Sequence, residues 1–315
     1  MAKTIALVLV VYSHIPGALC QQYLGSFFIF TFFFLSGFTG RTRLSWDAHQ
    51  KKRARRLLVP YLVFSLALVF VSGNHDAKDF AGIVYSRYSL YPLDRIPNVV
   101  FLRSRNTPLW FLTAMFVADG VYYALVRHIK SYKGLAAAVA VLTALAMAMG
   151  HLPVLLPWSL DTMPFFVIAM LMGHAIKGHD ELFSDRWSIV LLAFLFVLSC
   201  FLNGNINLSC RIYGHSVLLA LVSGMTGTLL LLSACKVLEN RSRLSVLAIL
   251  GRHTLTVFSL QMAVIHVCVN TLHTMGLNAD SGLWHAVISL FIIVVVFAVG
   301  TALSVVLRRL LPSVF

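Results

Sequence analysis

A lysine and a histidine on one face of the first apolar segment are the leading candidates for chemistry. Lys3 and His14 are eleven positions apart. In a helix that separation turns through about 1100°, which returns both side chains to nearly the same face, about 16 Å apart along the axis. Ionisable groups in an apolar segment are costly, so each is a functional candidate. A neutral imidazole can act as a general base or carry a group covalently. The pair therefore predicts a reaction centre, against the alternative of a histidine that only hydrogen-bonds within a bundle.

The basic run at residues 51–56 is a second candidate site. Arg53 and Arg56 stand three positions apart within it, so they share a helix face. Guanidinium groups pair bidentately with phosphate oxygens, and such a face would suit a phosphorylated ligand. The alternative is a charged run that orients the chain in a membrane and contacts anionic lipid. The spacing alone leaves both interpretations open.

Three further residues are weaker candidates for substrate binding. Ser36 ends the second apolar segment beside Gly37, where small residues allow close helix packing, and no Gly-x-Ser-x-Gly elbow surrounds it. Trp110 follows Pro108 at the start of the fourth segment, where an interfacial tryptophan is also expected. Gln261 falls near the middle of the ninth segment, where its amide needs a hydrogen-bond partner.

The elements that must position these residues are apolar segments close to the roughly 20 residues of a membrane-crossing helix. The chain has 59% hydrophobic and only 11% charged residues, whereas a soluble domain carries about 25% charged residues. We therefore predict an all-α polytopic membrane helix bundle, formed by a single domain over residues 1–315. The ten predicted segments lie near residues 4–22, 24–40, 57–73, 108–126, 134–150, 157–176, 187–203, 215–235, 250–270 and 284–307.

The distribution of basic residues predicts the topology. The formal net charge is +14, and most Lys and Arg fall on one side if the N-terminus is placed inside. The outward residues 74–107 are the exception; their tyrosines suit either sugar contact or an interfacial belt. Because Lys and Arg collect on the cytoplasmic side, we predict ten spans with both termini cytoplasmic. The main alternative has nine spans, with residues 4–40 forming a helical hairpin that does not cross fully.

Neither nucleic acid nor a metal is an expected partner. In a membrane bundle we assign the positive charge to topology, not to nucleic-acid binding. The five cysteines form no CxxC pair and no zinc spacing, so no metal site is predicted.

Six motifs follow one another along the chain. They are Lys3 and His14 with ten residues between them, Phe-Phe-Phe-Leu-Ser-Gly-Phe38, Arg53-x-x-Arg56 with Leu-Leu-Val-Pro-Tyr61, Pro-Leu-Trp-Phe-Leu112, Pro164-Phe-Phe-Val-Ile, and Gly-Arg-His-Thr-Leu255. Their order resembles the bacterial acyltransferase-three family of integral membrane O-acyltransferases. The resemblance covers about residues 1–310 and is closest to the branch of fucose-acetylase-like and exopolysaccharide acetyltransferases.

The resemblance implies a role for each matching residue. His14 would be essential for acyl transfer, and Arg53 and Arg56 would bind the acyl donor, expected to be acetyl-CoA. Lys3 would also bind the acyl donor. Many members have arginine at this position, and in most members a few more residues precede it. Many members have histidine where Gln261 stands. Because glutamine cannot be a general base, a role for Gln261 would be in binding.

The predicted function is transfer of an acetyl or similar acyl group from cytoplasmic acyl-CoA to a hydroxyl of a cell-surface or exported polysaccharide or a lipid-linked sugar. His14 would be the general base or the acyl relay, in a multi-pass protein of the bacterial inner membrane. A polysaccharide synthase complex would be a natural partner. One alternative is a transporter or flippase of a sugar or lipid precursor, which would need no acyl-CoA. Another is a non-catalytic subunit of a polysaccharide synthase.

Overall fold

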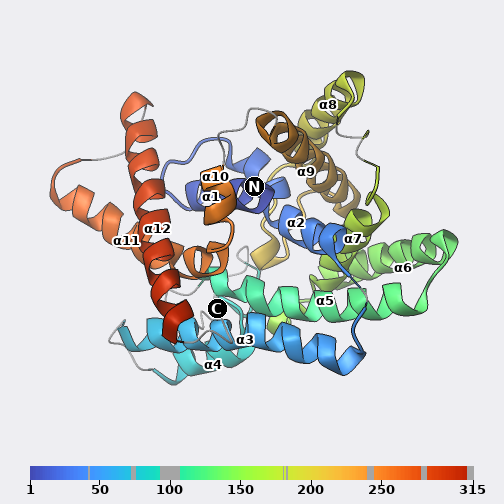
Figure 1. Cartoon of the computed structure of the whole chain (residues 1–315), viewed down its shortest axis with the longest axis horizontal. Helices are drawn as coiled ribbons and strands as arrows, with labels where there is room; N and C mark the ends of the chain where they lie inside the picture. The colour runs from blue at the N-terminus through green and yellow to red at the C-terminus, as the bar shows by residue number, and fades with distance from the viewer. Residues whose placement is uncertain are drawn as a thin grey trace.

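Helices form almost all of the regular structure, as the apolar segments predicted. A computed structural model describes residues 1–41, 43–71, 76–92, 107–179, 181, 184–239, 245–277 and 282–310; these residues form no strand, and Asn207 and Ile212 pair in an isolated bridge. The all-α class is thereby confirmed (Figure 1). The elements are α1 (Ala2–Ser13), α2 (Gln21–Thr39), α3 (Trp46–Val71), α4 (Ala77–Tyr85), η1 (Thr107–Leu109), α5 (Trp110–His128), α6 (Tyr132–Gly150), η2 (Pro157–Ser159), α7 (Met163–Ala175), α8 (Arg186–Asn203), η4 (Leu208–Cys210), α9 (Val217–Glu239), α10 (Ser245–Leu250), α11 (Thr254–Thr274) and α12 (Gly282–Leu310).

Each predicted apolar segment contains a helix, but the helices differ in their capacity to cross a membrane. Seven of the described helices are long and apolar enough to do so: α2, α3, α6, α8, α9, α11 and α12. Helix α1 has 12 residues, which is about 18 Å against a hydrocarbon core of about 30 Å. The first segment therefore differs from the predicted span over residues 4–22. Its short helix agrees with the first half of the alternative hairpin over residues 4–40, whereas α2, the second half, is long and apolar enough to cross.

Helices α2 and α7 approach each other closely at the centre of the bundle because small residues meet backbone on both sides. A Cβ atom added to Gly37 would lie 1.9 Å from the carbonyl oxygen of Met170, and one added to Gly173 would lie 2.1 Å from that of Phe34. Glycine is thus required at both positions, since any side chain would separate the helices. This contact holds α2 in the middle of the fold.

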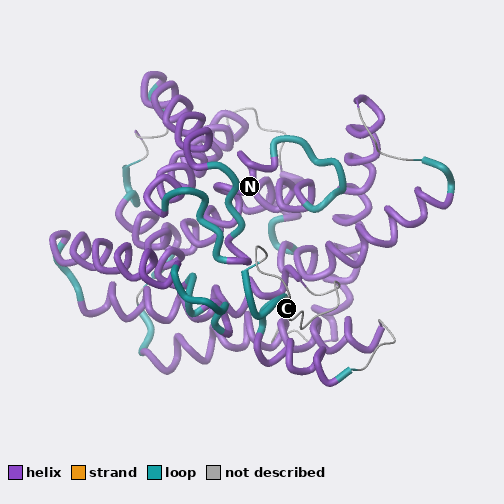
Figure 2. The backbone as a smooth tube through the Cα atoms, turned by 180° about the vertical axis from the view of Figure 1, so that it is seen from behind, coloured by secondary structure: helices purple, strands orange, loops and turns teal. Residues whose placement is uncertain are grey.

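Several connecting loops cross the middle of the bundle on the side seen in Figure 2. Three of these segments are joined by a buried ion cluster in which Asp161 binds Arg87 and Arg211. The exposed fraction of the three side chains is 0%, 0% and 1%, respectively. The cluster therefore replaces regular secondary structure as the support for these loops. Residues 93–106, part of the predicted outward segment, lie outside the described residues.

Candidate active site

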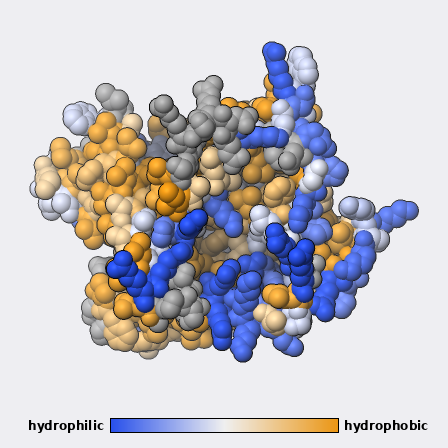
Figure 3. Space-filling model, viewed as in Figure 1, coloured by the Kyte–Doolittle hydropathy of each residue, from blue (hydrophilic) through white to orange (hydrophobic). Residues whose placement is uncertain are grey.

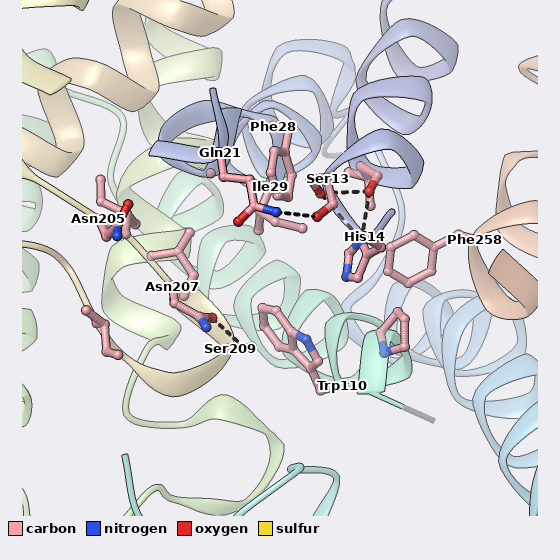
Figure 4. A pocket seen from close by; sticks show the side chains of 16 residues that line it. Ser13, His14, Gln21, Phe28, Ile29, Trp110, Asn205, Asn207, Ser209 and Phe258 are labelled. Carbon is pink, nitrogen blue, oxygen red and sulfur yellow. Dashed lines mark hydrogen bonds between the residues drawn. The ribbon is translucent and has the colours of Figure 1, made fainter. Parts of the chain in front are cut away.

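His14 lines a cavity of about 450 Å³ at the C-terminal end of α1. Helix α2 contributes Gln21, the start of α5 contributes Trp110, and α11 contributes Phe258. The remaining wall comes from residues 205–209 of the loop between α8 and α9. In Figure 4 the imidazole of His14 lies between the rings of Trp110 and Phe258. Two sequence candidates, His14 and Trp110, thus meet in one cavity.

The hydrogen bonding of His14 leaves one ring nitrogen available. Its Nδ1 lies 2.7 Å from the carbonyl oxygen of Val10, which can only accept a hydrogen bond. Nδ1 therefore carries the proton in the neutral ring, and the lone pair is on Nε2. Among the described residues Nε2 has no hydrogen-bond partner. This tautomer is the one that presents a basic or nucleophilic nitrogen to a ligand.

A second polar site is built around Asp119 of α5, whose side chain is 1% exposed. The Nε of Arg53 donates to one carboxylate oxygen of Asp119 at 2.8 Å, and Nη2 donates to the other oxygen. His49 Nε2 lies 2.6 Å from the same carboxylate, and its ring stacks on Tyr123 with the centroids 3.7 Å apart. Ser36 accepts a further hydrogen bond from Arg53 Nη2 at 3.1 Å. Arg53 is therefore held on two sides.

The three basic candidates, Lys3, Arg53 and Arg56, lie in different surroundings. Lys3 lies close enough to Arg53 for their charges to repel. Arg56 is exposed and makes no hydrogen bond or ion pair with the described residues. Arg53, by contrast, is half-buried and forms an ion pair with Asp119. Figure 3 shows hydrophilic side chains around a hollow in the middle of the face on which α3 lies. The structure therefore joins Arg53 to Ser36, places the charge of Lys3 within electrostatic reach of Arg53, and leaves Arg56 in solvent.

Gln261 does not have the partner that the sequence led us to expect. Its side chain is 0% exposed, and neither amide atom has a hydrogen-bond partner among the described residues. It lies one helical turn beyond Phe258, but is not among the residues that line the cavity. An unpaired buried amide costs about 1–3 kcal/mol.

The Gly-Arg-His motif places a turn beside the N-terminal end of α1. The hydroxyl of Thr4 donates to the carbonyl oxygen of Leu247 at 2.7 Å, which joins α1 to α10. Just beyond, Arg308 donates to the carbonyl oxygen of Arg252 at 2.5 Å. Burial lowers the pKa of His253, and the charges of Arg308 and Arg252 lower it further. Positive charge therefore gathers at this end of the fold, where Lys3 also lies.

Three helices each connect the Asp119 site to the cavity. Along α1 the connection runs from Lys3 to His14, over about 16 Å. On α2, Gln21 lines the cavity and Ser36 binds Arg53, about 22 Å further along. On α5, Trp110 lines the cavity and Asp119 lies about 14 Å along the helix. The two sites are therefore separate, and the same rigid elements hold both.

Sequence analysis missed the acidic member of this arrangement. Asp119 is the only acidic residue in the predicted apolar segment 108–126. The rule that selected His14, an ionisable group within an apolar segment, would have selected Asp119 as well. His49 and the cavity-lining asparagines carried no such signal, because their role depends on which loops and helices come together.

The described residues include no group of three or more His, Cys, Asp or Glu side chains placed to hold a metal ion.

No curated protein and no solved structure matches the chain. The acyltransferase-3 family, described as an acyltransferase domain, matches residues 1–309. That match covers nearly the whole chain and agrees with its apolar helices, as expected of a multi-pass membrane acyltransferase. The chain therefore belongs to the acyltransferase-3 family.

Proposed function

We propose that the protein transfers an acetyl or similar acyl group from acyl-CoA to a hydroxyl of a cell-surface or exported polysaccharide or a lipid-linked sugar. The single observation that carries the proposal is the state of His14. Its Nδ1 is bound to the carbonyl oxygen of Val10, and its Nε2 faces a cavity large enough for the reacting groups. Membership of an acyltransferase family supplies the reaction type. The proposed location is the bacterial inner membrane.

In this mechanism Nε2 of His14 removes the proton of the acceptor hydroxyl as its oxygen attacks the thioester carbonyl carbon. The carbon–oxygen bond of the new ester forms and the carbon–sulfur bond breaks. The imidazolium returns the proton to the sulfur, so the products are an ester and free CoA. The same nitrogen would carry the acyl group in a covalent relay, which a mass increase on His14 after rapid quenching would reveal.

The basic site supports acyl-CoA as the donor. CoA carries a diphosphate and a further phosphate, and the charges of Lys3 and Arg53 lie within electrostatic reach of each other. Arg53 Nη1 is not among the groups bound by Asp119 and Ser36, so it can donate to a phosphate while Asp119 holds the guanidinium. Arg56 would add charge from solvent at the mouth of this site.

The separation of the two sites supports an extended donor. A pantetheine arm that enters beside Arg53 would run along α1, α2 and α5 to bring its thioester to His14. The three helices give axial separations of about 14–22 Å, which an extended arm of that kind can cover. The acceptor would then approach from the loop side of the cavity, so donor and acceptor need not share an entrance.

The test is the O-acetyl content of surface glycan from a strain that lacks the gene and is complemented with variants. We expect wild-type protein to restore O-acetylation and His14→Gln to abolish it, because glutamine cannot accept the proton. His266→Gln, an exposed histidine of α11, is the matched control and should behave like wild type. Normal O-acetylation by His14→Gln at equal protein level would refute the catalytic role. Glycan export that fails without any change in acetylation would favour the transporter.

A further inference from the structure

One wall of the His14 cavity differs in chemistry from the wall that holds the histidine. The loop between α8 and α9 presents the amide side chains of Asn205 and Asn207, both of which are exposed. Across the cavity lie the rings of Trp110 and Phe258 (Figure 4). Amides can both donate and accept hydrogen bonds, whereas an aromatic face packs against the apolar face of a ring. This is a combination that suits polyhydroxylated molecules.

The amide wall is rigid because its backbone is paired locally. Asn207 and Ile212 exchange two backbone hydrogen bonds, at 2.8 and 2.9 Å. At the base of the loop, the buried side chain of Asn203 donates to the carbonyl oxygen of Tyr213 at 2.7 Å and accepts from the amide of Ser216 at 2.8 Å. The wall is thus formed before any ligand binds.

The buried ion cluster fastens this wall to the rest of the fold. Arg87 Nη1 donates to the carbonyl oxygen of Ser209, a cavity-lining residue, at 2.8 Å. Arg211, at the end of the same loop, binds Asp161 at 2.8 Å and the carbonyl oxygen of Val154 at 2.7 Å. Asp161 binds both guanidinium groups, so the cluster keeps a single net positive charge, and none of its three side chains is among the residues that line the cavity.

Among the described residues, the lining of the cavity offers no fixed charge to a ligand. None of its described lining residues is Asp, Glu, Lys or Arg, and His14 is the only ionisable side chain capable of a positive charge there. A carboxylate or phosphate on the acceptor would lose its hydration without gaining a counter-ion. Neutral hydroxyls, by contrast, would exchange water for the amides of Asn205 and Asn207.

We propose that the loop between α8 and α9 selects an uncharged polyhydroxylated acceptor, such as a neutral glycosyl unit, and that Asp161 is a positioning residue that keeps this wall in place. The proposal rests on the acyl transfer proposed above and extends it to the choice of acceptor. It assigns the binding of acceptor hydroxyls to Asn205 and Asn207, and the exclusion of acidic acceptors to the absence of a counter-ion among the described lining residues.

The experiment uses purified protein in phospholipid vesicles with acetyl-CoA and a matched pair of probes, an alkyl glucoside and the corresponding alkyl glucuronide. We expect transfer to the glucoside to exceed transfer to the glucuronide by at least about tenfold. The carboxylate of the glucuronide would lose hydration without gaining a counter-ion, and the cost of an unpaired charge lowers transfer by more than a factor of ten. Equal transfer to the two probes, or a preference for the glucuronide, would overturn the proposal.

Charge variants of the wall provide the second arm. Asn207→Arg supplies the missing counter-ion and should raise the glucuronide-to-glucoside ratio by about tenfold. Asn270→Arg, an exposed asparagine of α11 away from the cavity, is the matched control and should leave the ratio unchanged. The same change of ratio in both variants would contradict a role for the wall.

The positioning role is tested by Arg87→Lys, which keeps a charge opposite Asp161 but loses the contact with Ser209. We expect the KM for the glucoside to rise severalfold while the KM for acetyl-CoA is unchanged. A parallel rise in both values, or no rise in protein that folds normally, would refute it. If this variant fails to fold, the Asn207→Arg ratio still decides whether the wall selects the acceptor.

Acetylation of hydroxylamine, a small neutral nucleophile, separates the two proposals. Acetylation that depends on His14, combined with no transfer to the glucoside, would overturn the acceptor proposal alone. No acetylation of hydroxylamine by wild-type protein would overturn the proposed acyl transfer itself.

Discussion

Two buried aspartates in this protein each hold two basic side chains, but their surroundings differ. Asp119 binds His49 and Arg53 near the N-terminal end of α1, and Asp161 binds Arg87 and Arg211 behind the cavity wall. Arg53 keeps a 28% exposed side chain, whereas Arg87 and Arg211 are 0% and 1% exposed. The chemistry is similar, so the difference in access to water is informative.

Access to water decides which cluster can bind a ligand. A fully desolvated ion pair is costly to separate, since each charge would be left without a partner. The Asp161 cluster therefore acts as a fixed support for loops. A partly solvated arginine can gain a phosphate partner without losing its carboxylate, because its guanidinium has further donors. The Asp119 cluster can thus hold a ligand while it keeps its own geometry.

The largest expected effect is the loss of stability on Asp161→Asn. The substitution leaves two buried guanidinium groups with less compensation, which costs about 3–5 kcal/mol. Thermal unfolding of detergent-solubilised protein is the measurement. Asp47→Asn, at an exposed aspartate in the first turn of α3, is the control and should unfold close to wild type. If Asp161→Asn unfolded at the same temperature as wild type, the Asp161 cluster would not be needed for stability.

A smaller loss of stability with a clear functional effect is expected for Asp119→Asn. Arg53 can turn toward solvent when its carboxylate is lost, so the free energy of unfolding should fall by about 1–3 kcal/mol. The KM for acetyl-CoA should rise by about tenfold, because Arg53 is no longer oriented. Unfolding and steady-state kinetics of the same preparation test this. A loss of stability as large as that of Asp161→Asn would remove the distinction between the clusters.

Arg53→Lys sharpens the comparison within the basic run. Lysine keeps the charge but cannot bind both carboxylate oxygens of Asp119 and still reach Ser36, so we expect about a tenfold rise in the KM for acetyl-CoA. Arg56→Lys should change it by less than about twofold, because an exposed point charge is kept. Comparable kinetics for the two variants would mean that the held geometry of Arg53 is unimportant.

Among the changes to residues that hold Arg53, the smallest expected effect is that of Ser36→Ala. It removes one neutral acceptor, 3.1 Å from Arg53, and leaves the Asp119 pairing intact. A single hydrogen bond contributes about 0.5–1.5 kcal/mol, so the KM for acetyl-CoA should rise by no more than about tenfold. Loss of all activity in a stable variant would instead indicate that Ser36 contacts the reacting groups.

Several features were predictable because they depend on local pattern. The apolar segments predicted helices. The low content of charged residues and the distribution of Lys and Arg predicted a membrane protein. The spacing of Lys3 and His14 placed them on one face, and the order of six motifs pointed to the family that matches residues 1–309. The helices, the membrane-protein class and the shared face follow from composition and helix periodicity, which need no knowledge of what lies opposite each helix. The family rests on the resemblance of the motif order.

Other features depended on which helices meet. Sequence periodicity put Arg53 and Arg56 on one helix face, but packing against α5 paired Arg53 with Asp119 and left Arg56 in solvent. Gln261 was expected to find a partner, and its amide has none among the described residues. The end of α1 at Ser13 reflects the turn into α2, which apolar composition over residues 4–22 did not reveal.

Residue type and spacing are enough to specify helices and their apolar faces and to make His14 a candidate for chemistry, because these depend on contacts within a few turns of chain. The cavity that Nε2 of His14 faces depends on residues far apart in sequence. So does the contrast between the buried Asp161 cluster and the partly exposed Asp119 cluster. Exposure to water is a property of the assembled bundle, and it is what gives two similar aspartates different roles.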